Sequence, residues 1–379
     1  MTLPHDAMLR DPRDPQAPSG ENLGWYVPRN YCYEKRFFVP EQWKEKRIRL
    51  EFEGVAREAR VLVNGEQAGS HDYGYTGFSV PLEEFLHYGE ENCICVRAFN
   101  ASQPASRWYT GTGIYRPVWL CLSPEEHILR NGVRVTTLDY RNPEIQVEVR
   151  LEGQGEVQVS VLDGKQLLAQ GVRTAKEHTA FRFLLPGARL WSPENPRLYT
   201  CQVCFRGEKG TTDTESVVFG LRQTECTSEK GFLLNGERVI LKGACIHHDN
   251  GILGACAYDF AEERKVRILK ENGYNAIRSA HNPCSRALLE ACDRLGMLVL
   301  DEYADMWYIH KTPYDYASRV EKNWKRDLKE LVDRDYNHPS VIMYSTGNEV
   351  SETAQKRGIR LCGEMTRYLH GLDKTRPVT

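Results

Sequence analysis

The 379-residue sequence predicts two β-sandwiches followed by the first half of a parallel α/β barrel. Short runs that alternate polar and apolar residues fill residues 1–223, as half-buried strands do. After residue 240, apolar strand-like runs alternate with helical patterns, which is typical of βα units. Four of these runs end in polar side chains, and a barrel collects its active site from the ends of its strands on one face.

The composition excludes several classes of protein. Hydrophobic residues make up 41% of the chain, charged residues 27%, and the formal net charge is -2. The densest basic run, Lys44 to Arg49, is broken by Glu45 and leads into a strand, so no nucleic-acid partner is expected. No apolar stretch reaches the roughly 18 residues that a membrane span needs. The N-terminus lacks a signal-peptide pattern, so we expect a cytoplasmic protein that does not enter membranes.

Residues 1–125 are predicted to form the first sandwich, of the jelly-roll kind. Arg47 to Phe52 and Asn92 to Phe99 alternate polar and apolar residues. Asn64-Gly65 supplies the positive φ angles of a tight hairpin turn.

Residues 126–223 are predicted to form a second, immunoglobulin-like sandwich, because several short strands fit within about 100 residues. Asp163-Gly164 marks a hairpin turn between two of them. The expected strands are Glu144 to Leu151, Glu156 to Leu162, Ala180 to Leu185, Tyr199 to Phe205 and Ser216 to Phe219.

Residues 224–379 are predicted to begin with a hairpin over 231–240 and to continue as four βα units of a TIM barrel. A complete barrel takes roughly 250 residues, so we expect this one to be truncated. The expected strands are Leu241 to Cys245, Asn275 to Ser279, Met297 to Asp301 and Val341 to Ser345. The expected helices are Phe260 to Asn272, Ser285 to Leu295, Glu321 to Tyr336 and Thr353 to Leu372.

The twelve cysteines are expected to be free thiols in a reducing compartment. Many lie within apolar strands or helices and are expected to be buried. Cys201 and Cys204 are three residues apart in one strand and should point to opposite faces, so they cannot share a metal. The seven with expected burial are Cys93, Cys95, Cys121, Cys201, Cys204, Cys292 and Cys362.

Polar side chains follow each of the four predicted barrel strands. They are His247-His248-Asp249, Arg278 with His281, Asp301-Glu302 and Asn348-Glu349. Since parallel strands end at the same edge, these groups should lie close together at one end of the barrel. Adjacent side chains of an extended segment diverge, so the His-His-Asp run is not expected to hold zinc, and no metal site is predicted.

Several longer motifs resemble glycoside hydrolase family 2, the group of β-galactosidases, β-glucuronidases and β-mannosidases. They are Leu3-Pro-His-Asp6, Ser106-Arg-Trp-Tyr-Thr-Gly-Thr-Gly-Ile-Tyr-Arg116, Trp191-Ser-Pro-Glu-Asn-Pro196, Asn275-Ala-Ile-Arg-Ser-Ala-His-Asn-Pro283, and Asp335-Tyr-Asn-His-Pro-Ser-Val-Ile-Met-Tyr-Ser-Thr-Gly-Asn-Glu349. The resemblance covers nearly the whole chain. It implies a jelly-roll sugar-binding domain, an immunoglobulin-like domain and a TIM barrel, in agreement with the predictions made from the residues.

The resemblance also implies roles for the strand-end residues. Glu349 would be the acid/base of a retaining mechanism, which needs a second carboxylate about 5 Å away as the nucleophile. That nucleophile would lie on a later barrel strand, beyond Thr379. Asn348 would bond the 2-hydroxyl of the sugar, and His281 and His247 would contact the sugar. Arg278 would hold the nucleophile.

The segment after the third barrel strand offers further candidates. Trp307 could stack on a sugar ring, Asp305 could accept hydrogen bonds from sugar hydroxyls, and Glu302 could support the site or form a salt bridge at the rim. Some β-galactosidases of the family bind magnesium near this place. The motif Asp-Glu-Tyr-Ala-Asp-Met-Trp departs from the magnesium-binding version, so no cofactor is expected, with magnesium as the open alternative.

The sequence therefore predicts a β-glycosidase of family 2 that acts on a terminal β-linked sugar, with galactose first and glucuronic acid or mannose as alternatives. A small-molecule β-glycoside or oligosaccharide would be its partner, and homo-oligomers are common in the family. Two alternatives stay open. The chain could be an inactive truncated fragment, or it could be a carbohydrate-binding module that uses the first sandwich.

Overall fold

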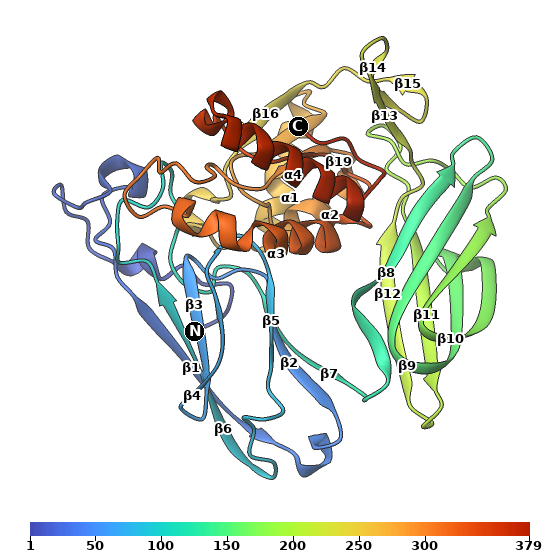
Figure 1. Ribbon diagram of the computed structural model, residues 1–379, viewed down its shortest axis with the longest axis horizontal. Helices are drawn as coiled ribbons and strands as arrows, with labels where there is room; N and C mark the ends of the chain where they lie inside the picture. Colours follow the sequence, from blue (N-terminus) through green and yellow to red (C-terminus); the bar gives the residue numbers. More distant parts are fainter.

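The computed structural model describes residues 1–379 as three parts, which Figure 1 colours from blue to red. A blue sandwich and a green sandwich lie side by side, and the yellow-to-red βα part lies above them. No helix of the structure combines the length and the apolarity that crossing a bilayer requires.

The first part is a jelly-roll sandwich of a four-stranded sheet, β1-β6-β3-β4, and a three-stranded sheet, β5-β2-β7. Strands β2 and β6 alternate exposed and buried residues as predicted, and their inward side chains build one apolar core. Asn64 and Gly65 have the expected positive φ angles of 51° and 90°. The strands are β1 Tyr31–Val39, β2 Arg47–Phe52, β3 Glu58–Val63, β4 Glu66–His71, β5 Phe78–Pro81, β6 Glu90–Phe99 and β7 Val118–Ser123; 3-10 helices span Ala7–Arg10, Gly20–Leu23 and Glu41–Trp43.

The second part is an immunoglobulin-like sandwich with its own core. Two of its strands are much longer than predicted. The strand pair expected at Glu144 to Leu151 and Glu156 to Leu162 is one 20-residue strand, because pairing with β10 resumes at Gln154 and Gly155 after a register shift between Lys176 and His178. The strands are β8 His127–Asp139, β9 Glu144–Asp163, β10 Gln166–Leu184, β11 Tyr199–Gly207 and β12 Thr212–Phe219.

The third part holds four parallel strands in the order β16-β17-β18-β19, which are the first four βα units of a TIM barrel. A small sheet of β13 Thr224–Thr227, β14 Gly231–Leu234 and β15 Glu237–Arg238 precedes it. The strands are β16 Gly243–Ile246, β17 Ala276–Ser279, β18 Leu298–Glu302 and β19 Val341–Ser345. The helices are α1 Asp259–Glu271, α2 Arg286–Leu295, α3 Ala317–Asp335 and α4 Lys356–Leu372, with 3-10 turns at Gly251–Leu253 and Ser351–Ala354.

Buried side chains join both sandwiches to the barrel part. Arg116, which is 1% exposed, donates to the carbonyls of Tyr75 in the jelly roll and Pro283 in the barrel, each at 2.8 Å. Trp191, from the predicted turn-rich corner, is fully buried and donates to the Asp293 carbonyl of α2 at 2.9 Å. Both contacts satisfy polar groups that would otherwise be buried unpaired.

The prediction of buried cysteines is only partly correct. All twelve are free thiols, and Cys201 and Cys292 are fully buried. Cys204 is half-buried on the opposite face of β11 from Cys201, as the spacing required. The expected burial is wrong for Cys93, Cys95, Cys121, Cys204 and Cys362, which are half-buried. Cys362 still packs against the edge of the barrel core.

Candidate active site

The candidate site lies where the four parallel strands end. The register pairs β16 with β17, β17 with β18, and β18 with β19, so their carboxyl ends form one edge. Asp301 and Glu302 are neighbours in β18 and point to opposite sides. Asp301 faces the helices and accepts a hydrogen bond from the Cys284 amide at 3.1 Å, whereas Glu302 faces the strand-end cluster.

Glu302 is the centre of a buried network. It is fully buried, and its carboxylate accepts from Arg278 at 2.7 and 3.1 Å and from Ser345 at 2.7 Å. His281 Nδ1 lies 3.0 Å from the other carboxylate oxygen. The nucleophile that Arg278 is predicted to hold would lie beyond Thr379; within residues 1–379 the Arg278 guanidinium donates to Glu302 and Asn348. The carboxylate of Glu302 is therefore closed to solvent and engaged by its donors.

Asn348 links this network to a second one around Asp305. Its carbonyl oxygen accepts from Arg278 at 2.9 Å, and its amide nitrogen donates to Asp305 at 2.8 Å. Arg107 and Lys311 also bind Asp305, at 2.8 and 2.9 Å. Burial alone would raise the pKa of Asp305, but these three donors outweigh it and hold the pKa below its usual value. Asp305 is therefore an ionised anchor at neutral pH.

Glu349 is exposed, unlike the buried strand-end residues Glu302, Asp305 and Asn348. Its side chain is 74% exposed, and its one charged neighbour is Arg107, whose Nη2 lies 3.6 Å from the carboxylate. The residue has a φ angle of +44°, which is rare for a side chain other than glycine or asparagine and costs about 1 kcal/mol or more. Such backbone strain is often found at functional sites, where the surrounding structure enforces it.

The two histidines after β16, His247 and His248, lie in different surroundings. His247 stacks on Trp108 with ring centroids 5.4 Å apart, and it meets His281 edge-on at 5.4 Å. His248 is buried, packs edge-on against Tyr75, and lies with Nε2 3.2 Å from the Thr110 carbonyl. Of the two, His247 is the one placed beside the other strand-end groups.

Trp307 does not lie where the sequence predicted. It is 1% exposed, belongs to the main barrel core, and donates its indole N–H to the Thr346 carbonyl at 2.8 Å. No face of the ring is open for stacking on a sugar. The expected substrate contact of Trp307 is therefore corrected to a structural role beneath the end of β19.

Three residues that the sequence did not single out complete the site. Arg107 and Trp108 come from the jelly-roll segment Ser106 to Arg116, and Lys311 follows β18. Trp108 and Asp305 also line a small cavity of 50 Å³ beside the strand ends. The motif at 106–116 could have indicated a contribution to the site, because it holds arginines and aromatics in a segment without strand pattern.

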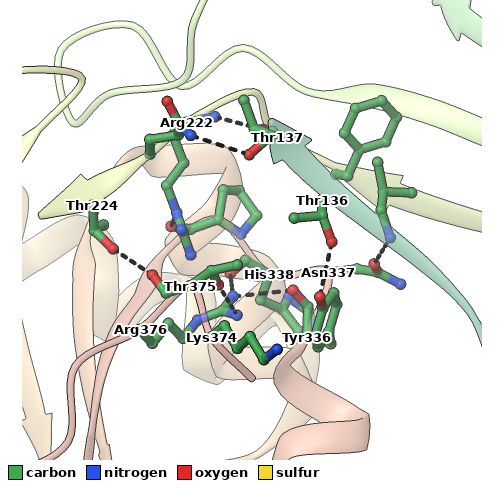
Figure 2. Close-up of a pocket in the computed structure, with 15 residues that line it drawn as sticks. Thr136, Thr137, Arg222, Thr224, Tyr336, Asn337, His338, Lys374, Thr375 and Arg376 are labelled. Atoms are coloured by element: carbon green, nitrogen blue, oxygen red, sulfur yellow. Dashed lines mark hydrogen bonds between the residues drawn. The ribbon is translucent and has the colours of Figure 1, made fainter. Parts of the chain in front are cut away.

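A second cavity lies at the opposite end of the strands. It measures 180 Å³ and lies between the immunoglobulin-like part and the barrel part, with Arg222 and Lys374 on its walls (Figure 2). Arg222 binds the carbonyls of Pro339 and Val341, which precede and begin β19. Residues at this end of a barrel serve stability, so this cavity is not the catalytic candidate.

Three family models match the three parts of the chain. Residues 22–124 match the family model "Glycosyl hydrolases family 2, sugar binding domain", and residues 129–222 match "Glycosyl hydrolases family 2". Residues 226–379 match "Glycosyl hydrolases family 2, TIM barrel domain".

Individual proteins are similar over the whole chain. A β-galactosidase of Bacteroides ovatus is 34% identical, with 100% of this chain and 50% of that protein covered. A solved family 2 member from Bacteroides cellulosilyticus has a TM-score of 0.95 at 38% identity, covering 100% of this chain and 51% of that one. A solved β-glucuronidase of Bacteroides uniformis has a TM-score of 0.84 at 28% identity, covering 100% and 48%. The chain thus spans about half the length of these relatives, and it belongs to glycoside hydrolase family 2.

Proposed function

We propose that this chain provides the acid/base half of a retaining β-glycosidase site, with Glu349 as the acid/base. The observation that carries the proposal is the position of Glu349. It is an exposed carboxylate on a strained backbone at the end of β19, beside residues locked by two hydrogen-bond networks. A proton donor must reach the departing glycosidic oxygen, and Glu349 is free to do so.

The neighbouring residues would orient the sugar. Asn348 is fixed by Arg278 and Asp305, yet its amide nitrogen has a second N–H that could donate to a sugar hydroxyl. The rings of His247, His281 and Trp108 pack against one another, with centroids 5.4 to 5.5 Å apart. Aromatic faces and fixed donors are the usual partners of a pyranose ring and its hydroxyls.

The nucleophile is proposed to come from a barrel strand outside residues 1–379. Retention requires a second carboxylate about 5 Å from the first. Glu302 and Asp305 are each bound by at least three donors, and both are almost fully buried. Neither is free to attack a sugar carbon.

A β-galactoside is the first candidate substrate, because a relative named β-galactosidase is 34% identical to this chain. Relatives named β-glucuronidase are 29% to 31% identical, so a β-glucuronide is the second candidate. A β-mannoside is a further alternative within the family.

We infer that no magnesium binds beside β18. A divalent cation prefers free carboxylate oxygens. Here Asp305 is already neutralised by Arg107 and Lys311, and Glu302 by Arg278. The residues present therefore do not fit a magnesium site.

The test compares three proteins. The first is the 379-residue chain alone. The second is a chimera that joins residues 1–379 to the second half of the Bacteroides ovatus β-galactosidase, and the third is the same chimera with Glu349→Ala. The chimera should release p-nitrophenol from p-nitrophenyl β-galactoside, and Glu349→Ala should slow release by about 10²–10⁴-fold. Azide should restore part of the rate and yield the β-galactosyl azide, since azide needs no general base.

The outcomes separate the alternatives. Glu364→Gln, on the exposed face of α4, is the matched control and should leave the rate unchanged. Turnover by the chain alone would contradict an external nucleophile. A folded chimera that binds galactose but never hydrolyses the substrate would instead favour a carbohydrate-binding module.

A further inference from the structure

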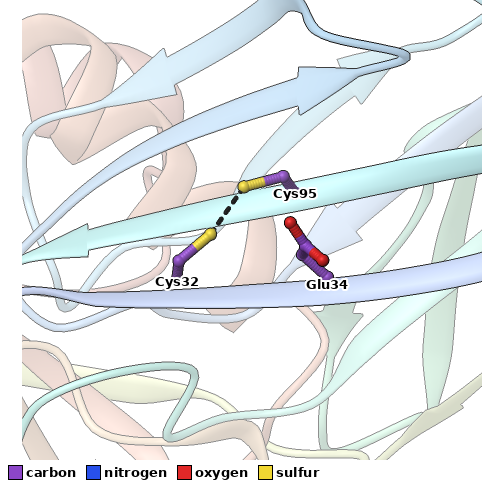
Figure 3. A group of neighbouring side chains, drawn as sticks. All are labelled: Cys32, Glu34 and Cys95. Carbon is purple, nitrogen blue, oxygen red and sulfur yellow. Dashed lines mark hydrogen bonds between the residues drawn. The ribbon is translucent and has the colours of Figure 1, made fainter.

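Three side chains capable of binding a metal converge on the jelly-roll sandwich, in the sheet of β1 and β6. They are Cys32 and Glu34 of β1 and Cys95 of β6 (Figure 3). Their ligand atoms all lie within 4.8 Å of one another, and the two sulfur atoms are 2.7 Å apart. Cys32 and Glu34 are exposed and Cys95 is half-buried.

The sheet itself produces this convergence. Cys32 and Glu34 are two residues apart in β1, so they share one face, and Tyr33 between them turns to the sandwich core. In β6, Cys95 lies between the buried residues Ile94 and Val96 and therefore also faces outward. The antiparallel register places Cys95 directly opposite Glu34. The cluster therefore rests on paired backbone rather than on a loop.

We propose that Cys32, Cys95 and Glu34 bind a thiophilic divalent cation of the zinc type. Two thiolates and one carboxylate match the ligand preferences of zinc, and a water would take the fourth tetrahedral position. Each thiol releases its proton to solvent on binding, and no electrons are transferred. With a divalent cation the cluster has a net charge of -1, and Arg97 stands opposite Cys32 in the register to balance it.

The register favours a metal over a disulfide. Cys32 is opposite Arg97, so Cys95 is its diagonal neighbour. Diagonal neighbours in an antiparallel pair are roughly 7–8 Å apart, whereas a disulfide requires Cα atoms within roughly 4.4–6.8 Å. A tetrahedral zinc ion with bonds of about 2.3 Å holds its sulfur ligands roughly 3.8 Å apart. The two sulfur atoms, 2.7 Å apart here, would separate by about 1.1 Å to reach that distance.

The test uses the whole chain, reduced, stripped of metal and titrated with Co²⁺ as a spectroscopic probe. A thiolate-to-cobalt charge-transfer band should appear, saturate at one ion per chain, and disappear when Zn²⁺ displaces the cobalt. Cys32→Ser and Cys95→Ser should each abolish the band, and Glu34→Gln should weaken binding while keeping it. Cys226→Ser, which removes another exposed thiol, is the matched control and should bind normally.

A second measurement does not depend on the variants folding. In the unmodified chain, Zn²⁺ should protect Cys32 and Cys95 from alkylation, as peptide mass spectrometry would show, while Cys226 reacts at its usual rate. Equal alkylation of Cys32 and Cys95 with and without Zn²⁺ would overturn the proposal. So would a cobalt band that survives both serine substitutions, or a Cys32–Cys95 disulfide that forms in air and excludes zinc. None of these outcomes depends on glycosidase activity.

Discussion

Asp305 shows how one residue can join separate segments at the candidate site. Its carboxylate accepts hydrogen bonds from Arg107 of the jelly roll, Lys311 of the segment after β18, and Asn348 at the end of β19. These donors hold its pKa below the usual value even though burial opposes them. The ionised form of Asp305 is therefore more favourable in the folded chain than in the unfolded chain.

Asp305→Asn should lower the unfolding free energy by roughly 2–3 kcal/mol at neutral pH, because Arg107 and Lys311 lose their anion. The folded-state pKa of Asp305 is depressed, so its contribution is fully present above the unfolded pKa of about 3.9 and is lost as pH falls through the folded value. The difference in unfolding free energy between the wild type and Asp305→Asn should therefore disappear at acid pH. Urea denaturation at neutral and acid pH measures this. Asp14→Asn, at an exposed position, is the control, and equal stability of Asp305→Asn and wild type at neutral pH would contradict the role.

Two buried histidines make a second prediction at the residue scale. Burial lowers the pKa of both His71 and His248 to about 3. Between an unfolded pKa of about 6.5 and the folded value, the unfolded chain binds protons that the folded chain does not. The unfolding free energy should therefore fall as pH falls through this window, by about 1.4 kcal/mol per pH unit for each histidine.

Chemical denaturation across this window tests the prediction. His71 and His248 together cause part of the slope of unfolding free energy against pH. His248→Gln should remove about half of that part. His178→Gln, on the exposed face of β10, should not change the slope. A steep slope that survives substitution of both His71 and His248 would assign the effect to other groups.

Helix α4 offers a matched pair of glycines at the element scale. A Cβ at Gly358 would lie 1.9 Å from the Glu352 carbonyl oxygen, whereas a Cβ at Gly371 would meet nothing within 4 Å. Glu352 in turn accepts the backbone N–H groups of Trp307 and Tyr308, at 3.1 and 2.8 Å. A shift at Gly358 would therefore reach the segment that carries Asp305.

Gly358→Ala should lower the unfolding free energy by roughly 1–3 kcal/mol, because backbone atoms must move. Gly371→Ala should raise it by roughly 0.5 kcal/mol, since alanine restricts the unfolded chain and fits the helix. Thermal denaturation of the two variants provides the measurement. Equal effects of the two substitutions would mean that α4 can move away from Glu352 freely.

The elements also show what the sequence could predict. Strands β2 and β19 match their predicted residues, because strict alternation and an uninterrupted apolar run are each distinctive patterns. The continuation of β9 past Leu151 could not be predicted, because it depends on pairing of Gln154 and Gly155 with β10 across a register shift rather than on side-chain pattern. Pairing across strands is tertiary information that a local pattern does not contain.

At the candidate site, too, local patterns predict some features, whereas contacts between distant segments could not be predicted. The strand-end residues of β16–β19 could be predicted together, because parallel strands end on one face. The contact between Arg107 and Asp305 joins residues 198 positions apart, in different domains, so no local spacing could indicate it. The burial of Trp307 was also missed, because an aromatic residue near a strand end fits a substrate platform and a core position equally well.

At the scale of the whole molecule, Arg116 couples the jelly roll to the barrel part. Its guanidinium is buried between the Tyr75 and Pro283 carbonyls, and no carboxylate pairs with it within 4.0 Å. Replacing it leaves two buried carbonyl groups without donors, each worth about 1–3 kcal/mol. The jelly roll, the immunoglobulin-like sandwich and the barrel part have separate main cores, so cooperative unfolding depends on such contacts.

Arg116→Met should therefore lower the melting temperature and split one calorimetric transition into two, with the jelly roll unfolding apart from the rest. Arg264→Met, on the exposed face of α1, is the control and should melt like the wild type. Separate unfolding of the jelly roll would also affect the candidate active site, because Arg107 and Trp108 belong to the same jelly-roll segment as Arg116. Loss of the Arg107 contact with Asp305 should accompany the first transition. A single transition in Arg116→Met at the wild-type temperature would show that the remaining interface holds the two parts together without this residue.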